Sequence, residues 1–428
     1  MSDERVFSKC AWRLIPFVTL LYIVSFLDRV NVGFAALTMN KDLGFSPAVY
    51  GIGAGIFFLG YGPFQFPANL ILHRVGAHRW LSLILLVWGV LSTSNALISG
   101  PVSFYVLRFL LGFAEAGLVP GVLLYLTYWF PLSYRSRFSA TFLAGSPVAF
   151  VIGGPLSGFI LQMEGIGGLR GWQWLFILEG MPACMLALLV LRFLPDRPAE
   201  AAWLAPEEKA VIVGALASDP KMEKAGLTSV LLDFRVVALG FVNFGVLAGG
   251  YGAALWLPQI IAGMGFSTFA IGFLIVIPYL AAVIVMIVWA QSSDVRHEHI
   301  WHIAIPAFVA AGGFAVASVS TSSTLSLVAL TFSAAGIFAS LAPQVSAVSS
   351  FLSGPAVAAG IGLMTAIGTT GGFVGPIVTG FLTKDGDYSR AMLALGSALF
   401  VAAVIAVLAG RAIAPRGRAL TAEAVNSR

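Results

Sequence analysis

The feature that most constrains this chain is a series of apolar runs, each about 20 residues long, that recur along its length. A helix of that length crosses the hydrocarbon core of a bilayer, which is about 30 Å thick. Because lipid offers the backbone no hydrogen-bond partner, a spanning segment must be a helix or a strand of a closed barrel. Barrel strands alternate apolar and polar residues, and these runs do not. The runs therefore predict an all-α integral membrane protein.

We place twelve transmembrane helices between the charged or Gly/Pro-rich breaks. The first six occupy residues 12–34, 48–72, 80–98, 102–126, 138–163 and 173–194. The second six occupy residues 236–261, 269–291, 300–319, 325–346, 357–382 and 391–414. The first run is too long for the apolar core of a cleaved signal peptide, so we expect it to span. The predicted parts are a six-helix half at 1–194, a central loop at 195–235, a six-helix half at 236–414 and a tail at 415–428.

Composition agrees with a membrane protein and excludes several other classes. Apolar residues make up 59% of the chain and charged residues 10%, whereas about a quarter of a soluble domain is charged. The net charge of +5 is spread over short loops with no basic stripe, so we expect no nucleic-acid partner. Cys10 and Cys184 have no paired spacing, so neither a disulfide framework nor a zinc site is expected.

The distribution of basic residues predicts the orientation, because cytoplasmic loops of membrane proteins carry an excess of Lys and Arg. With the N-terminus inside, most of the 24 Lys and Arg residues fall in inner segments. The outer segments carry only Lys41, Arg170, Lys384 and Arg390. We therefore expect both termini and the central loop to be cytoplasmic.

Two predicted helices carry an acid and a base inside their apolar runs. The first helix contains Asp28 and Arg29, and the fourth contains Arg108 and Glu115. A separation of seven residues places Arg108 and Glu115 on one face of a helix. Because a charge at the bilayer centre costs roughly 2.5–3.5 kcal/mol on insertion scales, such residues are candidates for function.

These four residues predict an anion site that is coupled to protonation. Two guanidinium groups facing one cavity bind a carboxylate well, since each keeps its charge and presents a planar fork of donors. A buried Asp28 or Glu115 holds a proton more readily than an exposed acid, and a nearby guanidinium opposes this. In the alternative interpretation, Asp28 with Arg29, and Arg108 with Glu115, are ion pairs that only hold helices together.

Neutral polar residues extend the candidate site. Tyr61 and Gln65 lie four residues apart on one face of the second helix, where they can donate hydrogen bonds to a ligand or to a neighbouring backbone. The Gly-rich run at 368–376 lacks the Lys of a P-loop and lies inside an apolar helix. We interpret it as a closely packed helix that presents Thr365 and Thr369 to the cavity.

Several motifs resemble the anion:cation symporter branch of the major facilitator superfamily, which contains phthalate, tartrate, sugar-acid and sialic-acid carriers. They are FLDRVNVGF at 26–34, FFLGY at 57–61, PAN at 67–69, LRF at 107–109, AEAG at 114–117, GWQWLF at 171–176, EG at 179–180 and GGFVGP at 371–376. The resemblance implies the major facilitator fold of two six-helix halves. It also implies Arg29 and Arg108 as carboxylate binders, Asp28 and Glu115 as proton sites, and Tyr61 as a substrate contact.

The chain departs from the branch at positions that would read the hydroxyl groups of a substrate. Gln65 stands where the branch commonly has Glu, and Thr365 and Thr369 stand where Asn is frequent. Ala339 occupies a place often taken by Trp, and Ser146 replaces a longer amide. The resemblance therefore implies that the part of the site that binds the anion is intact. The part that would contact hydroxyl groups has smaller and less polar side chains, which argues against a polyhydroxylated sugar acid as substrate.

We interpret the chain as a secondary carrier that imports a small organic anion with protons by alternating access. Within transport, the alternatives are an exporter or a sodium-coupled carrier of the same fold. Outside transport, they are an intramembrane enzyme or a receptor. An enzyme would need a metal set or an activated Ser within a helix, yet the five His residues lie at or near cytoplasmic helix ends. We expect a monomer in the lipid of a bacterial inner membrane, with no enzymatic activity, cofactor or metal.

The predicted orientation can be tested by labelling. Cysteines introduced at Lys41 and Lys384 should react in intact cells with an impermeant thiol reagent, because both positions are expected outside. A cysteine at Glu208 should stay unlabelled. Reaction at position 208 from outside would reverse the orientation.

Overall fold

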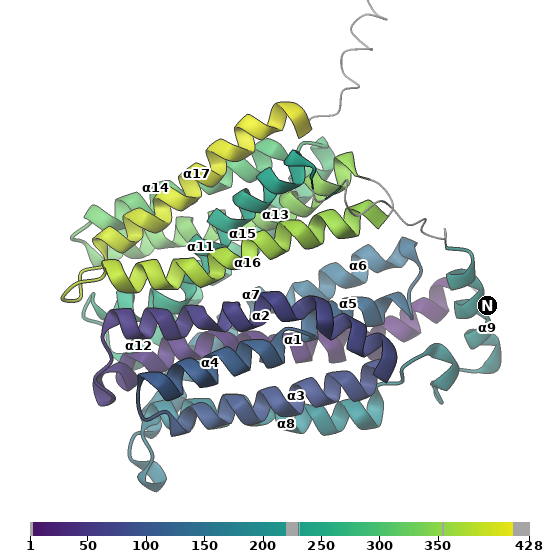
Figure 1. The fold of residues 1–428 in the computed structure, drawn as a ribbon, viewed down its shortest axis with the longest axis horizontal. Coiled ribbons are helices and arrows are strands. Elements are labelled where there is room, and N and C mark those ends of the chain that lie inside the picture. The colour runs from purple at the N-terminus through teal and green to yellow at the C-terminus, as the bar shows by residue number, and fades with distance from the viewer. Residues whose placement is uncertain (1–2, 220–229, 231, 353–354, 414–428) are drawn as a thin grey trace, which may run out of the picture. The chain divides into compact units, whose positions relative to one another are not determined.

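The regular structure of this protein is almost entirely α-helical (Figure 1). The computed structural model describes residues 3–219, 230, 232–352 and 355–413. These residues form no β-strand beyond one isolated bridge between Lys384 and Asp387. The predicted all-α class is confirmed.

The helices fall into two series separated by the central polar segment. The first series is α1 (Asp3–Asp42), α2 (Pro47–Val75), α3 (Ala77–Ser94), α4 (Pro101–Glu115), α5 (Leu118–Thr127), α6 (Leu132–Leu143), α7 (Gly145–Ile160) and α8 (Gly171–Phe193). The central segment contains α9 (Pro206–Ala217). The second series is α11 (Phe234–Ala262), α12 (Thr268–Leu274), α13 (Val276–Arg296), α14 (Ile300–Val319), α15 (Ser323–Phe351), α16 (Pro355–Leu382) and α17 (Ser389–Ile413).

Eleven segments of the described chain are long and apolar enough to cross a membrane. Three of them join two helices end to end, namely α4 with α5, α6 with α7 and α12 with α13. The eleven segments coincide with eleven of the twelve predicted runs. The remaining run forms α2, whose 29 residues are long enough to span but include Tyr61, Gln65 and two internal prolines that lower its hydropathy.

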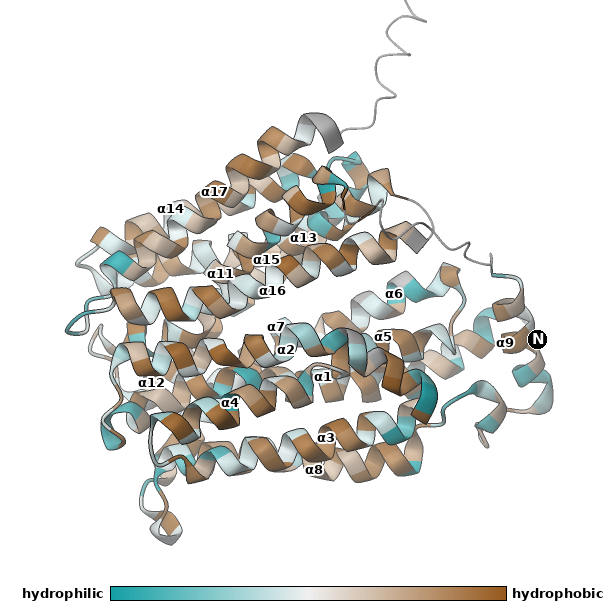
Figure 2. Cartoon of the chain, viewed as in Figure 1, coloured by the Kyte–Doolittle hydropathy of each residue, from teal (hydrophilic) through white to brown (hydrophobic). Residues whose placement is uncertain are grey.

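The outer surfaces of the helices suit a lipid environment. Figure 2 shows hydrophobic residues along the long helices and hydrophilic ones mainly at helix ends and in loops. Large apolar side chains are exposed in rows, including Leu83, Val87 and Val90 on α3 and Leu188 and Leu191 on α8. A soluble monomer rarely exposes so much contiguous apolar surface, whereas lipid tails solvate it well.

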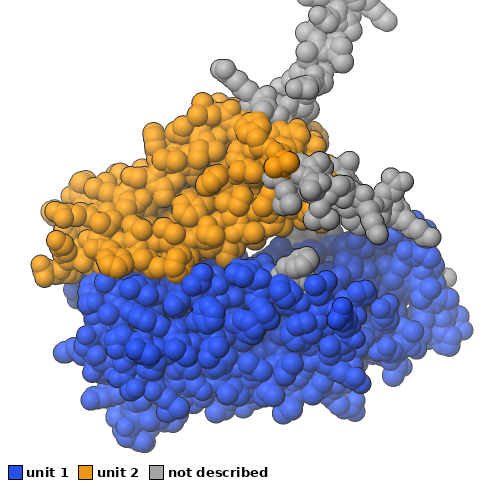
Figure 3. All heavy atoms as spheres, viewed as in Figure 1, with its two compact units in different colours: residues 1–221, 254–279 blue, residues 222–253, 280–428 orange. Residues whose placement is uncertain are grey.

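The chain forms two compact units (Figure 3). Unit 1 comprises Met1–Lys221 and Ala254–Tyr279, and within it α3 packs on α8, α2 on α4, and α1 on α7 and α8. Unit 2 comprises Met222–Ala253 and Leu280–Arg428, and within it α14 packs on α15 and α17. The predicted domain boundaries at 194 and 235 stay predictions.

The contact between α2 and α4 is close because glycines lie on both sides of it. A Cβ added at Gly60 would meet the backbone of Phe109, and one at Gly112 would meet the backbone of Phe57. Small residues let membrane helices approach each other in this way. The close approach brings the ring of Phe57 against the helix that carries Arg108 and Glu115.

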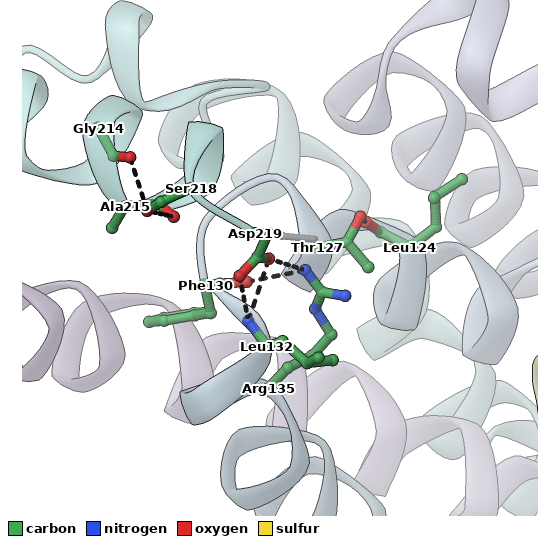
Figure 4. A network of polar contacts seen from close by, with 9 residues as sticks. All are labelled: Leu124, Thr127, Phe130, Leu132, Arg135, Gly214, Ala215, Ser218 and Asp219. Atoms are coloured by element: carbon green, nitrogen blue, oxygen red, sulfur yellow. Dashed lines mark hydrogen bonds and ion pairs between the residues drawn. The ribbon is translucent and has the colours of Figure 1, made fainter. Parts of the chain in front are cut away.

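The first part of the central segment is anchored to unit 1. Glu208 of α9 forms an ion pair with Lys9 of α1 at 2.7 Å, and this hydrogen bond holds the pKa of Glu208 below its usual value. Asp219 accepts hydrogen bonds from the backbone N–H of Leu132 and from Arg135 (Figure 4). The sequence indicated only a polar break here, so α9 and its anchors are new information.

These contacts also improve the choice of labelling position. The side chain of Glu208 is buried against Lys9, whereas its neighbour Glu207 is exposed. A cysteine at position 207 therefore reports orientation without interference from burial. Lys41 and Lys384 are exposed, as the labelling experiment requires.

Candidate anion and proton site

A buried ion pair joins α1 to the end of α4. Arg29 Nη2 lies 2.8 Å from Glu115 Oε2, and the Ser25 hydroxyl donates to the same oxygen at 3.3 Å. The Arg29 side chain is 4% exposed and that of Glu115 is 0% exposed. The ion pairs considered from the sequence, within α1 and within α4, are not the ones that form between these described residues. The pair connects two helices instead.

Aromatic rings surround the Arg29 guanidinium. Its Cζ atom lies 4.6 Å from the ring centroid of Tyr61, 4.9 Å from that of Phe26 and 5.2 Å from that of Phe57. Ring faces attract a cation most strongly where water is excluded. Tyr61 therefore contributes its ring to the site by holding Arg29 in place, in addition to any role of its hydroxyl.

Arg108 is in a different situation from Arg29. Its side chain is fully buried, and its Cζ lies 5.0 Å from the ring centroid of Phe57. None of its three guanidinium nitrogens has a hydrogen-bond partner within the described part of the chain. Each buried donor left unsatisfied costs about 1–3 kcal/mol, and more when it is charged. Such a group can bind an anion by donating hydrogen bonds to it.

Asp28 is held by neutral donors. It accepts hydrogen bonds from Trp88 Nε1 and Ser92 Oγ of α3, and from Asn31 Nδ2 at 3.0 Å. Successive residues on a helix point about 100° apart, so Asp28 faces α3 while Arg29 faces α4. The two candidate acids therefore have different surroundings. Glu115 forms an ion pair with a guanidinium, whereas Asp28 accepts hydrogen bonds from three neutral groups.

The structure brings together only some of the predicted site residues. Arg29, Tyr61, Arg108 and Glu115 form one cluster around the Phe57 ring in unit 1. Gln65 is half-buried on α2 without a hydrogen bond to any described residue. Ser146 donates to the carbonyl of Leu143 at 3.1 Å.

The remaining predicted residues belong to unit 2. Thr365 and Thr369 lie on α16, where the Thr369 hydroxyl donates to the carbonyl of Thr365 at 2.8 Å. Ala339 is buried on α15. The hydroxyl of Thr369 is therefore already used within its own helix, and a ligand role for these residues stays a prediction.

Sequence analysis missed a third buried acid, Glu179, in the middle of α8. Glu179 belongs to the EG motif at 179–180, and the rule that selects Asp28 and Glu115 applies equally to it. Glu179 is 3% exposed, and its Oε1 accepts a hydrogen bond from Ser157 Oγ at 2.9 Å. An acid within an apolar run of 20 residues was the signal that could have found it.

Comparison with known proteins gives the family. A model of the Major Facilitator Superfamily matches residues 18–353. A relative from Agrobacterium vitis, named "Putative tartrate transporter", is 45% identical over 96% of this chain and 92% of its own length. A "Quinolone resistance transporter" of Acinetobacter baumannii is 40% identical over 89% of each chain. The "Inner membrane transport protein RhmT" of Escherichia coli is 35% identical over 88% of each.

The fold agrees with this assignment. A bacterial homolog of the human lysosomal transporter Spinster, in an inward-facing conformation, superposes with a TM-score of 0.80 and covers 94% of this chain and 97% of that one, at 18% identity. The chain belongs to the major facilitator superfamily. It is a multi-pass membrane transporter and not an enzyme, and the family resemblance of the motifs is confirmed.

The unpartnered Arg108 makes a testable prediction about stability. Arg108→Met keeps an unbranched side chain but removes the buried charge. The ligand-free variant should therefore unfold at a higher temperature, and its free energy of unfolding should rise by about 1–3 kcal/mol. Stabilisation by added carboxylate should disappear in the same variant. Thermal unfolding in detergent with and without a carboxylate panel measures both.

A matched control is Arg235→Met, since Arg235 pairs with Asp233 at 2.7 Å. This variant should gain no stability and should keep the carboxylate response. An Arg108→Met protein that is less stable than wild type, and still stabilised by carboxylates, would contradict the assignment of Arg108.

Proposed function

We propose that this transporter imports a small organic anion together with protons. The observation that carries the proposal is the Arg29–Glu115 ion pair next to the unpartnered guanidinium of Arg108. A carboxylate needs planar pairs of donors, and two buried guanidinium groups supply them. The relative named for tartrate, a short carboxylate, supports this class of substrate.

Coupling follows from competition for Arg29. When Glu115 is ionised, it occupies one edge of the Arg29 guanidinium. When a proton from the aqueous phase binds Glu115, the attraction weakens and Arg29 can donate to the substrate instead. Release of substrate and proton on the other side restores the ion pair.

Charge balance favours this scheme over binding of the anion alone. The two arginines and an ionised Glu115 carry one net positive charge, and an ionised Asp28, which acts on Arg108, offsets it. Protonation adds one positive charge and each substrate carboxylate removes one, so the empty and the loaded cluster carry the same charge when one proton accompanies each carboxylate. A buried site whose charge does not change avoids a large desolvation penalty in either state.

The surroundings of the carrier complete the proposal. We place it as a monomer in the lipid of a bacterial inner membrane with both termini cytoplasmic, supported by the basic asymmetry of the loops and by the inner-membrane relative. An exporter is the second candidate, because one relative is named for quinolone resistance. An inward proton gradient distinguishes the two, since it drives accumulation by a symporter and exclusion by a proton-exchanging exporter.

The coupling scheme predicts that binding and coupling can be separated. Glu115→Gln should abolish proton-driven accumulation in proteoliposomes while substrate exchange across the membrane continues, since the Gln side chain keeps its size but cannot ionise. Arg108→Lys should instead weaken binding about 10-fold or more, because Lys keeps the charge but loses the planar fork.

A purely structural ion pair would behave differently. Both changes would then lower stability together, and exchange and accumulation would fall in parallel. Well-folded Glu115→Gln protein that still concentrates substrate under a pH gradient would show that Glu115 does not couple transport to protons.

The small polar groups outside the cluster predict selectivity. The Thr369 hydroxyl donates within its own helix, the Ser146 hydroxyl donates to the carbonyl of Leu143 at the end of α6, and Ala339 has no hydroxyl. Each buried substrate hydroxyl left unmatched costs about 1–3 kcal/mol, so compact aromatic or short aliphatic carboxylates should outcompete six-carbon sugar acids. Inhibition of the uptake of a labelled substrate by each unlabelled acid measures this order of affinity. Stronger inhibition by the sugar acids than by the compact carboxylates would overturn the prediction.

A further inference from the structure

We infer that Glu179 is a second proton-carrying residue of this transporter. It forms an acid pair with Asp28, which lies on a different face of α1 from Arg29. The inference rests on the proposed proton-coupled function for its role in transport. It adds a residue and a site to that proposal, because Glu179 contacts neither arginine of the anion cluster through an ion pair in the described chain.

The Glu179 carboxyl is enclosed by three helices. It lies in the middle of α8, which packs on α1, α3 and α7. Its Oε1 accepts from Ser157 Oγ of α7 at 2.9 Å, and its Oε2 has no hydrogen-bond partner within the described residues. The side chain is 3% exposed. A buried carboxyl group with one oxygen that accepts no hydrogen bond costs free energy in its charged form.

The charged neighbour of Glu179 is another acid. Asp28 of α1 is the ionisable group that acts on it, and no base lies within ion-pair distance of it in the described chain. Asn31 lies next to both carboxyls and donates from Nδ2 to Asp28 at 3.0 Å. Arg108 attracts the charge of Asp28, whereas the described chain gives Glu179 no ion-pair partner. The doubly charged state of the two acids is therefore disfavoured, and the pair retains a proton.

The partners of the two acids decide which one holds that proton. Asp28 receives hydrogen bonds from Trp88, Ser92 and Asn31, which stabilise its charged form. Glu179 receives one such bond, from Ser157, and its second oxygen receives none from the described residues. The proton therefore resides on Glu179. In the transport cycle, Glu179 takes this proton from one aqueous phase and releases it to the other, which leaves Glu179 as a carboxylate. This step requires the protonation of Glu115, so the loss of Glu115 stops the movement of both protons.

The first test measures the number of protons per substrate. In proteoliposomes, the substrate gradient that stops net flux at a fixed pH gradient and voltage gives the ratio. Glu179→Gln should lower the ratio by about one proton, and the Glu207→Gln control, at an exposed position of α9, should leave it unchanged. An unchanged ratio in folded Glu179→Gln protein overturns the inference.

A second variant keeps the carboxyl and so does not depend on the folding of Glu179→Gln. Ser157→Ala removes the hydrogen bond that favours the charged form of Glu179, so the acid should hold its proton to higher pH. The infrared carbonyl band of a protonated carboxylic acid, followed by pH titration of purified protein, should persist to higher pH in Ser157→Ala than in wild type. It should lose amplitude in Glu179→Gln. No shift with Ser157→Ala overturns the inference.

The outcomes separate the two proposals. If Glu115→Gln uncouples transport while Glu179→Gln leaves the ratio and the infrared band unchanged, the proposed function stands and Glu179 has no proton role. Wild-type protein that transports its substrate with no proton flux would overturn both.

Discussion

The Arg29–Glu115 ion pair is the interaction on which the rest of the site depends. It joins α1 to α4 at a depth where either charge alone would be unstable, and its 2.8 Å separation places the two groups in direct contact. Next to this pair, α2 and α4 approach closely at Gly60 and Gly112. The Phe57 ring lies near both arginines, whose Cζ atoms are 5.2 and 5.0 Å from its centroid.

The two arginines carry different energetic roles. Arg29 pairs with Glu115 and lies against three aromatic rings, whereas Arg108 is buried with no hydrogen-bond partner in the described chain. Leaving Arg108 unsatisfied lowers the stability of the empty carrier, and we propose that it also makes the site selective for an anion. Proteins commonly accept such a cost at functional sites.

Much of the fold followed from the sequence because the bilayer imposes one length and one type of secondary structure. Eleven of the predicted runs are confirmed as helices apolar enough to span, and α2 is a helix made less apolar by Tyr61 and Gln65. The helix α9 was not predicted, because its position depends on contacts of Glu208 with Lys9, which is 199 residues away in sequence. Short polar segments carry no periodic signal that reveals such anchoring.

The site could be predicted in its residue types but not in its pairing. A charge inside an apolar run identified Asp28, Arg29, Arg108 and Glu115, and the spacing of seven correctly placed the last two on one helix. Which acid meets which base depends on how the helices rotate against each other, and spacing within one helix does not contain that information. Glu179 satisfies the same rule, since it lies inside the predicted run at 173–194, but its lack of an ion-pair partner among the described residues is visible only in the structure.

Proton uptake on substrate binding tests the central claim most directly. Calorimetric titration of a transported carboxylate into purified protein, in two buffers of different ionisation enthalpy, gives the number of protons bound per substrate. Competition between Glu115 and the substrate for Arg29 predicts uptake of about one proton near neutral pH, reduced in Glu115→Gln. Binding of the carboxylate with no proton uptake by wild-type protein at any pH from mildly acidic to mildly basic would contradict it.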